Sequence, residues 1–120
     1  MGKIFVVGIG PGNRAQMTIQ AQDVLWQCDV IVGYTVYVEL IKKAFPEETF
    51  QQKEFLATPM RKETDRCRLV FEEAGKGKSV ALVCSGDAGV YGLSGLILEL
   101  SEQFPQVDIA MIPGTTAALT

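Results

Sequence analysis

The 120-residue sequence predicts an α/β protein, built as a parallel five-stranded sheet between two layers of helices. Short apolar segments alternate with segments of helical periodicity along the whole chain, the order expected when helices connect parallel strands. The segment 80–84 is apolar without interruption, as strands buried on both faces of a parallel sheet are. Glycine-rich stretches follow this segment and the first apolar segment, so two of the expected strands end in loops of small residues.

The expected strands and helices succeed one another in a regular order. Strands are predicted at residues 3–7, 29–32, 49–54, 80–84 and 107–111. Helices are predicted at 18–27, 36–44, 62–74 and from about 91 to 103, and a further helix begins near the end of the sequence. Thr18 suits a helix start because its hydroxyl can accept a backbone N–H, and Pro46 ends the second helix. The third strand is polar and is therefore expected at or near an edge of the sheet.

The domain organisation is simple. No repeat, linker or low-complexity segment divides the chain, so residues 1–120 are expected to form one domain. A loop near 112–116 leads into residues of helical character, and the sequence stops at Thr120, where that helix should begin. We therefore expect the 120 residues to be the N-terminal part of a longer protein.

Composition and charge narrow the classes of partner. Hydrophobic residues make up 48% and charged residues 21% of the chain, which is typical of a soluble globular protein. The net charge of -3 argues against a nucleic-acid partner, because phosphate-binding surfaces are usually basic. No apolar run approaches the roughly 18 residues of a membrane span, and no signal peptide precedes the first strand. We expect no membrane partner and a cytoplasmic location.

The cysteines indicate packing and no metal chemistry. Cys28, Cys67 and Cys84 are widely spaced, form no CxxC pair, and stand in a chain without histidine. A structural zinc site and a Cys–His catalytic pair are therefore not expected. The three thiols are interpreted as reduced, mostly buried small hydrophobic groups.

The glycine-rich stretches at 8–12 and 85–92 are the candidate ligand loops. In open α/β sheets ligands bind outside the carboxyl ends of the strands, and small residues let a ligand approach the backbone. The alternative is a tight strand-to-helix turn that only requires glycine. The first stretch is not a dinucleotide fingerprint, because Asn13 replaces the third glycine and no acid follows the second strand.

The stretch at 77–79 has the letters that end a phosphate-binding P-loop. The match is false, because Glu72 stands where the earlier glycine is needed and because the stretch precedes a strand. A turn between a helix and a strand, with solvated lysines, is the preferred interpretation.

Four stretches together resemble the tetrapyrrole (corrin and porphyrin) methyltransferase family. They are residues 7–12 followed by 17–18, 29–34, 85–92 and 113–117, and their order and spacing are specific in combination. Within the family the resemblance is greatest to the branch that methylates C17 of precorrin-3B or cobalt-factor III. It is carried by residues 33–37, by 59–60 ahead of Glu63, and by 86–92. It covers all 120 residues and the first half of a typical member.

This resemblance implies an enzyme. Family members transfer a methyl group from S-adenosylmethionine to a tetrapyrrole carbon, releasing S-adenosylhomocysteine, and hold the cofactor between two α/β domains. The implied reaction is methylation of C17 coupled to contraction of the macrocycle in cobalamin biosynthesis. A tetrapyrrole substrate and a homodimer are implied partners. The family's C-terminal domain is absent from this chain, so these residues alone are expected to be inactive.

Residue-by-residue matching to the family implies a set of cofactor contacts. These are Pro11, Ser85, Gly86, Asp87, Val90, Thr116 and Ala117. Relatives that act on uroporphyrinogen carry an aspartate after the second strand, whereas this chain has 33–35 (Gly-Tyr-Thr) there, so no catalytic base is assigned. Tyr34, Tyr37 and Tyr91 are candidates either for lining the substrate site or for packing with the hydroxyl at the surface.

Two alternatives remain open at this point. One is another methyltransferase of the same fold, acting at a different precorrin position or, like the diphthine-type enzymes, on a protein. The other is a non-catalytic half-domain. A corrin site needs cations for its many carboxylates, and Arg14, Arg61 and Lys62 are candidates for that role. The sequence does not distinguish a cobalt-free substrate from a cobalt-bound one.

Overall fold

The computed structural model describes residues 2–10, 17–59, 63–84 and 87–112, with the backbone only for 87–92 and 94. Its strands are β1 (Lys3–Gly8), β2 (Val30–Tyr34), β3 (Glu54–Thr58), β4 (Ser79–Cys84) and β5 (Asp108–Ile112). Its helices are α1 (Ile19–Gln27), α2 (Thr35–Ala44), α3 (Glu48–Gln51), α4 (Glu63–Gly75) and α5 (Asp87–Ser101). The strands form one parallel sheet in the order β3-β2-β4-β1-β5, which confirms the predicted fold class.

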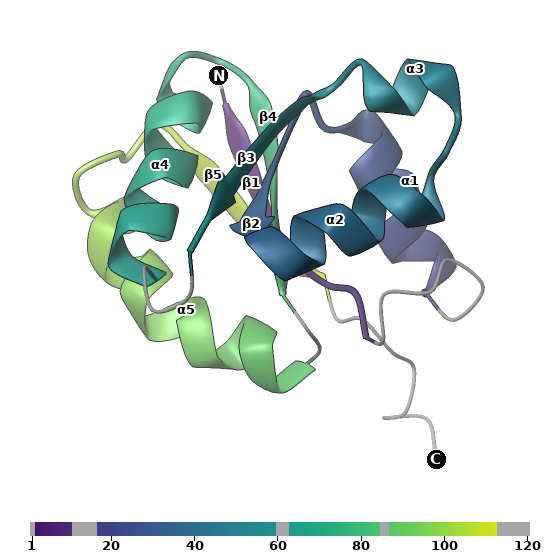
Figure 1. The fold of residues 1–120 in the computed structure, drawn as a ribbon. Helices are drawn as coiled ribbons and strands as arrows, with labels where there is room; N and C mark the ends of the chain where they lie inside the picture. Colours follow the sequence, from purple (N-terminus) through teal and green to yellow (C-terminus); the bar gives the residue numbers. More distant parts are fainter. Residues whose placement is uncertain (1, 11–16, 60–62, 85–86, 113–120) are drawn as a thin grey trace.

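The helices lie on opposite faces of the sheet because the crossovers between its parallel strands all have the same handedness. The first two connections move the chain toward β3, and the next two return it toward β5. Crossovers between parallel strands are almost always right-handed, so connections that run in opposite directions place their helices on opposite faces. Accordingly, α1, α2 and α3 cover one face, and α4 and α5 cover the other (Figure 1).

The sheet separates two hydrophobic cores. In β4, Val80 and Leu82 face α4 and α5, whereas Ala81 and Val83 face α1 and α2. All four side chains are buried, as the uninterrupted apolar pattern predicted. The helices contribute buried side chains to the two cores from Cys67, Val70, Phe71, Ala74, Ile97 and Leu100 on one face and from Ala21, Val24, Leu25, Ile41 and Phe50 on the other.

The N-cap prediction for the first helix is confirmed. The Thr18 hydroxyl accepts a hydrogen bond from the backbone N–H of Ala21 at 3.0 Å, and α1 begins one residue later. The last long helix differs from its prediction, because α5 begins at Asp87 and ends at Ser101, earlier than the range 91–103 at both ends.

The predicted third strand at 49–54 is wrong. Residues 48–51 form the short helix α3, and the strand begins at Glu54, so that 57–58 belong to β3 and not to a loop. The helical turn buries Phe50, whose ring stacks on Phe45 at a centroid distance of 4.5 Å and meets Trp26 edge to face at 5.0 Å. Burial of an aromatic ring outweighs the weak local preference of this polar segment. The predicted edge position is correct, since β3 pairs only with β2 among the described strands.

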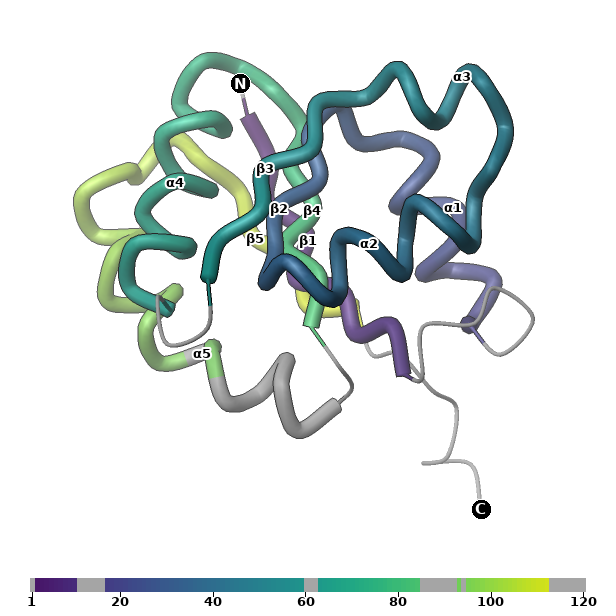
Figure 2. Tube along the Cα trace, viewed as in Figure 1, coloured from purple at the N-terminus to yellow at the C-terminus, as the bar shows by residue number. Residues whose placement is uncertain are grey.

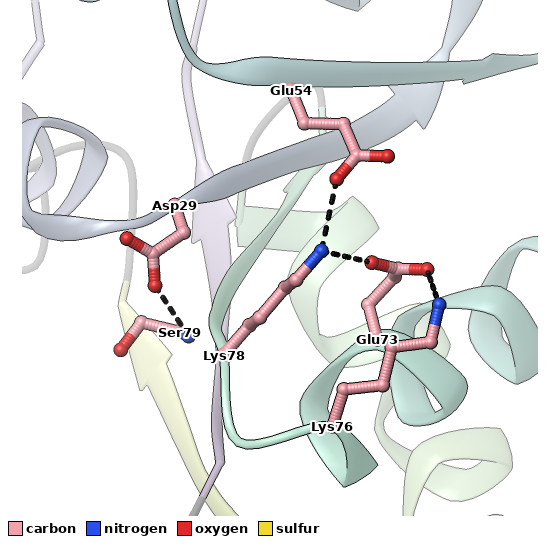
Figure 3. A network of polar contacts seen from close by, with 6 residues as sticks. All are labelled: Asp29, Glu54, Glu73, Lys76, Lys78 and Ser79. Atoms are coloured by element: carbon pink, nitrogen blue, oxygen red, sulfur yellow. Dashed lines mark hydrogen bonds and ion pairs between the residues drawn. The ribbon is translucent and has the colours of Figure 1, made fainter.

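A charged network joins the amino ends of the strands (Figure 3). The Glu73 carboxylate of α4 accepts from Lys76 at 3.0 Å and from Lys78 at 3.1 Å, and Lys78 also reaches Glu54 of β3 at 3.2 Å. The side chains of Lys76 and Lys78 remain 61% and 38% exposed, as predicted for solvated lysines, and they also form ion pairs because they follow an acid at the end of α4. The turn itself is as predicted, with Gly77 at φ 92° and β4 following it.

Asp29 makes the second polar link at this end of the sheet. Its backbone N–H donates to the carbonyl of Ser79 at 2.8 Å, and its carboxylate accepts from the N–H of Ser79 at 3.2 Å (Figure 3). These two hydrogen bonds join the residue before β2 to the first residue of β4.

None of the helices in the described ranges is both long and apolar enough to cross a membrane.

Candidate functional site

All five strands run in the same direction, so their carboxyl ends lie along one side of the sheet, called here the carboxyl edge. Its strand ends are Gly8, Tyr34, Thr58, Cys84 and Ile112. Both candidate ligand loops leave the sheet at this edge, which is where open α/β sheets bind ligands. The opposite side, with the charged network of Glu73, is called here the amino edge.

The loops after β1, β4 and β5 start beside one another. Gly8 pairs with Cys84 and Val7 pairs with Ile112. The N–H of Ile9 donates to the carbonyl of Cys84 at 2.8 Å, which extends the pairing one residue beyond β1. The helices that follow these two strands, α1 after β1 and α5 after β4, lie on opposite faces of the sheet (Figure 2). Neighbouring strands whose connections diverge in this way create the ligand crevice of α/β proteins.

Two glycines shape this edge through the backbone. Gly10 has φ 58°, a left-handed conformation that side-chain-bearing residues rarely adopt. Gly33 lies against β4, and a Cβ atom there would stand 2.5 Å from Cγ2 of Val83 and 3.3 Å from its carbonyl oxygen. Gly33 therefore leaves room for the Val83 side chain of β4 against the backbone of β2, just before both strands end.

The predicted cofactor contacts fall largely outside the described residues. Pro11, Ser85, Gly86, Thr116 and Ala117 are outside them, whereas Asp87 and Val90 lie in the first turn of α5 with only their backbone described. Gly10 is at the carboxyl edge, and the strands that lead to 86 and 114 end there too. The structure therefore brings together the strand ends that precede the predicted contacts, and the contacts themselves stay predictions.

A second group of polar residues lies at the ends of β2 and β3. The Thr35 hydroxyl donates to the carbonyl of Thr58 at 3.1 Å and so ties the first residue of α2 to the last residue of β3. The rings of Tyr34 and Tyr37 meet edge to face at 5.4 Å, and both side chains are half-buried. These two tyrosines sit at the carboxyl edge, and Tyr37 packs against the hydrophobic core on the face of α1 and α2. A substrate-lining role for them stays a prediction, and Tyr91 lies outside the described side chains.

Arg66 is a residue of this edge that sequence reasoning did not single out. It lies on α4 and is 8% exposed, and its Nη1 donates to Oγ1 of Thr58 at 2.6 Å and to the Pro59 carbonyl at 3.4 Å. A signal was available, because position 66 falls on the apolar stripe that continues through Val70 and Ala74. A cation on such a stripe must meet polar partners when the helix packs.

The cysteines have no nucleophilic character in this fold. Burial raises the pKa of Cys28 and Cys84 to about 12 and that of Cys67 to about 11, so the thiolate is absent at neutral pH. All three are free and buried, in agreement with their interpretation as small hydrophobic groups. The described polar groups of the carboxyl edge are thus hydroxyls, phenols, backbone amides and one guanidinium, which can hold and orient a polar ligand.

Comparison with known proteins gives consistent relatives. The model of the family described as Tetrapyrrole (Corrin/Porphyrin) Methylases matches residues 3–120. The chain is 44% identical over 117 residues to a probable cobalt-factor III C(17)-methyltransferase of Salmonella typhimurium, with 97% of this chain and 46% of that protein covered. It is 42% identical over 118 residues to the cobalamin biosynthesis protein CbiHC of Archaeoglobus fulgidus, with 98% of this chain and 25% of that protein covered.

A solved structure gives the same picture. The methyltransferase CobJ superposes with a TM-score of 0.79 at 34% identity, with 99% of this chain and 48% of that chain covered. The chain therefore spans about half the length, or less, of the relatives that it matches.

Proposed function

The chain belongs to the tetrapyrrole (corrin/porphyrin) methylase family, and we propose that it is the N-terminal domain, residues 1–120, of a cobalamin-biosynthesis methyltransferase. The proposed reaction transfers a methyl group from S-adenosylmethionine to C17 of precorrin-3B or cobalt-factor III, coupled to ring contraction. The observation that carries the proposal is the 44% identity to a probable cobalt-factor III C(17)-methyltransferase over 97% of the chain. The second domain, a homodimer and a cytoplasmic location are parts of the same proposal.

The cofactor is proposed to bind where β1, β4 and β5 end. The ends of β1 and β4 are paired through Gly8 and Cys84, and Gly10 adopts the left-handed conformation. Such a backbone, with small side chains, can bring amides and carbonyls within hydrogen-bonding distance of an amino acid and a ribose. These features fit S-adenosylmethionine, whose sulfonium supplies an activated methyl group.

The residues proposed to hold it are Pro11, Ser85, Gly86, Asp87, Val90, Thr116 and Ala117. Asp87 is proposed to attract the cationic groups of the cofactor, since opposite charges at close range stabilise binding. The loop backbone at 85–86 is proposed to bind its polar groups, and Val90 to contact the adenine. The chain's contribution to the rate is then positional, because a methyl group held in line with a nucleophilic ring carbon reacts without reorganisation of solvent.

The substrate is proposed to lie toward β2 and β3. Tyr34 and Tyr37 are half-buried at that end of the carboxyl edge and can present aromatic surface to a macrocycle. No catalytic base is proposed, because the segment 33–35 (Gly-Tyr-Thr) lacks the aspartate that relatives acting on uroporphyrinogen carry there. A methyltransferase acting on another precorrin position, or on a protein as diphthine-type enzymes do, is the competing outcome of the test.

The test is binding and turnover with the full-length protein. Calorimetry should show binding of S-adenosylhomocysteine to the full-length protein and weaker or no binding to residues 1–120, because half of the proposed cleft is then missing. Incubation with S-adenosylmethionine and either precorrin-3B or cobalt-factor III should give a product heavier by one methyl group in mass spectrometry. A full-length protein that binds the cofactor product but methylates neither ring would refute the proposed substrate.

A further inference from the structure

Two charged residues are buried within the described ranges, and their surroundings differ. Glu73 is 6% exposed and has two lysine partners within 3.1 Å. Arg66 is 8% exposed, and its polar contacts in the described part of the chain are the Thr58 hydroxyl and the Pro59 carbonyl. One buried charge thus has two ionic partners, whereas the hydrogen bonds of the other, within the described residues, go to uncharged oxygens.

An uncompensated buried cation is costly. Removing a guanidinium from water costs free energy that neutral acceptors offset only in part, and a carboxylate is the partner that offsets it best. The guanidinium carries five N–H donors in a planar fork, and the two contacts of Arg66 both use Nη1. No fully buried side-chain nitrogen in the described residues lacks a hydrogen-bond partner. The remaining nitrogens of Arg66 therefore keep some contact with solvent.

The position of Arg66 relates it to the candidate site. Thr58, its hydroxyl partner, is the last residue of the edge strand β3, and its side chain shares the sheet face of Leu56, which packs toward α4 and α5. The guanidinium thus lies at the carboxyl edge beside the end of β3, on the face of the sheet that α4 and α5 cover.

We propose that Arg66 binds a carboxylate of the tetrapyrrole substrate at the ends of β3 and β2. This inference rests on the proposed function, since the precursors of the corrin ring carry acetate and propionate side chains. A planar guanidinium with free donors matches a carboxylate in a bidentate geometry. The cofactor also has a carboxylate, but its proposed loops follow β1, β4 and β5, whereas Arg66 is bonded to β3 at the other end of the strand order.

The experiment measures two ligands on the same variants of the full-length protein. Uroporphyrin III, a stable tetrapyrrole with a carboxylate on every side chain, is titrated by fluorescence, and S-adenosylhomocysteine is titrated by calorimetry. Arg66→Met should weaken porphyrin binding by about tenfold or more, the usual effect of losing a charge-assisted bond, and leave the affinity for S-adenosylhomocysteine within about twofold. Arg66→Lys, which keeps the charge but loses the fork, should fall between wild type and Arg66→Met.

Arg68→Met is the matched control. Arg68 lies two residues along the same helix and is exposed, so this variant makes the same change of charge away from the edge. It should bind both ligands as the wild type does. Melting temperatures are recorded for every variant. A variant that binds both ligands less because less of it is folded is recognised by its lower melting temperature.

The outcomes separate this inference from the proposed function. Equal loss of both ligands, loss of S-adenosylhomocysteine alone, or porphyrin affinity unchanged in Arg66→Met each overturns the assignment of Arg66 to the substrate. A wild-type protein that binds S-adenosylhomocysteine but not the porphyrin also overturns it, and leaves the cofactor part of the proposed function intact. A wild-type protein that binds neither ligand removes the proposed function and this inference together.

Discussion

The two edges of the sheet are built from different chemical groups. At the amino edge, ion pairs between side chains connect α4, β3 and the turn before β4; they involve Glu73, Lys76, Lys78 and Glu54. At the carboxyl edge next to β1, backbone pairing connects β1 and β4 through Gly8 and Cys84 and continues to Ile9. Substitutions that remove the charged partners at the amino edge should therefore change stability. Substitutions in the loops that follow β1 and β4 should change binding.

The largest effect on stability is expected at Gly33, a residue near the carboxyl edge that packs against β4. Gly33→Ala places a methyl group 2.5 Å from Cγ2 of Val83, so that the Val83 side chain or the backbone must shift. Overpacking of this kind costs about 1–3 kcal/mol of unfolding free energy. Thermal denaturation of the full-length protein measures it. Gly95→Ala is the control, because Gly95 is exposed on α5 and its added methyl group would have no neighbouring atom within 4 Å, and a helical alanine there should raise stability by up to about 1 kcal/mol.

The amino edge is tested by Glu73→Gln. Loss of the carboxylate leaves Lys76 without its ion-pair partner and weakens the link to Lys78, at an expected cost of about 1–2 kcal/mol at neutral pH. The matched variant Glu72→Gln changes an exposed neighbour and should stay within about 0.5 kcal/mol of wild type. Denaturant unfolding distinguishes them, and equal effects of the two would show that the network contributes nothing specific.

The same carboxylate gives the amino edge a pH dependence of defined sign. Its hydrogen bond with Lys76 lowers the pKa of Glu73 below its ordinary value of 4.5. A carboxylate whose pKa is lower in the folded state contributes stability above its ordinary pKa and loses that contribution as the pH falls through the folded-state value. Wild type should therefore lose more stability than Glu73→Gln between pH 5 and a pH below the folded-state pKa of Glu73, in acid titrations followed by circular dichroism.

A smaller effect is expected at Lys53, which closes the amino edge from the other face. Its ammonium group donates to the carbonyls of Trp26 and Cys28 at the end of α1, at 2.6 and 2.5 Å. Lys53→Met removes a cation from a helix C-terminus and should cost about 1 kcal/mol. Lys43→Met, an exposed lysine in the last turn of α2, makes the same charge change without those carbonyl contacts. If Lys43→Met destabilises the protein as much as Lys53→Met does, the effect comes from the loss of charge alone.

The smallest stability change, with the largest change in binding, is expected at Asp87. If the carboxylate contacts the cofactor, Asp87→Asn should weaken S-adenosylmethionine binding by the full-length protein about tenfold and leave the apo melting temperature nearly unchanged. If Asp87 only caps α5, both quantities should stay near wild type, since asparagine caps as well as aspartate. Asp108→Asn at the amino edge, an exposed position at the start of β5, is the control and should affect neither quantity.

The elements that the sequence predicted well are those whose signal is local. The apolar run of β4 and the Thr18 cap of α1 need no knowledge of the rest of the chain. The prediction for the segment around Phe50 is wrong because its ring packs against Trp26, 24 residues earlier in the chain, and against Phe45, and these contacts decide its conformation. Local polarity suggested an edge strand there and contained no information about those rings.

The candidate site also contains parts that local sequence patterns predict and parts that they do not. The glycine loops were found because small residues after an apolar strand are a local pattern. That the loop after β1 starts beside the loop after β4 depends on strand order, which no local pattern contains. Arg66 and Glu73 both interrupt the apolar stripe of α4, yet their partners, Thr58 in one case and two lysines in the other, appear only when the helix packs.

The place of β1 in the strand order has a consequence for synthesis of the protein. Lys3 pairs with Ser79 on one side and with Asp108 on the other, so β1, which precedes the other four described strands in the sequence, pairs with the last two of them. Until β4 emerges, the apolar side chains of Ile4, Val6 and Val7 have no sheet to join, and long-range parallel pairing forms slowly. Between the synthesis of β1 and that of β4, the nascent chain thus carries a hydrophobic strand without its partners, and we expect a chaperone that binds apolar segments to act on it during this interval.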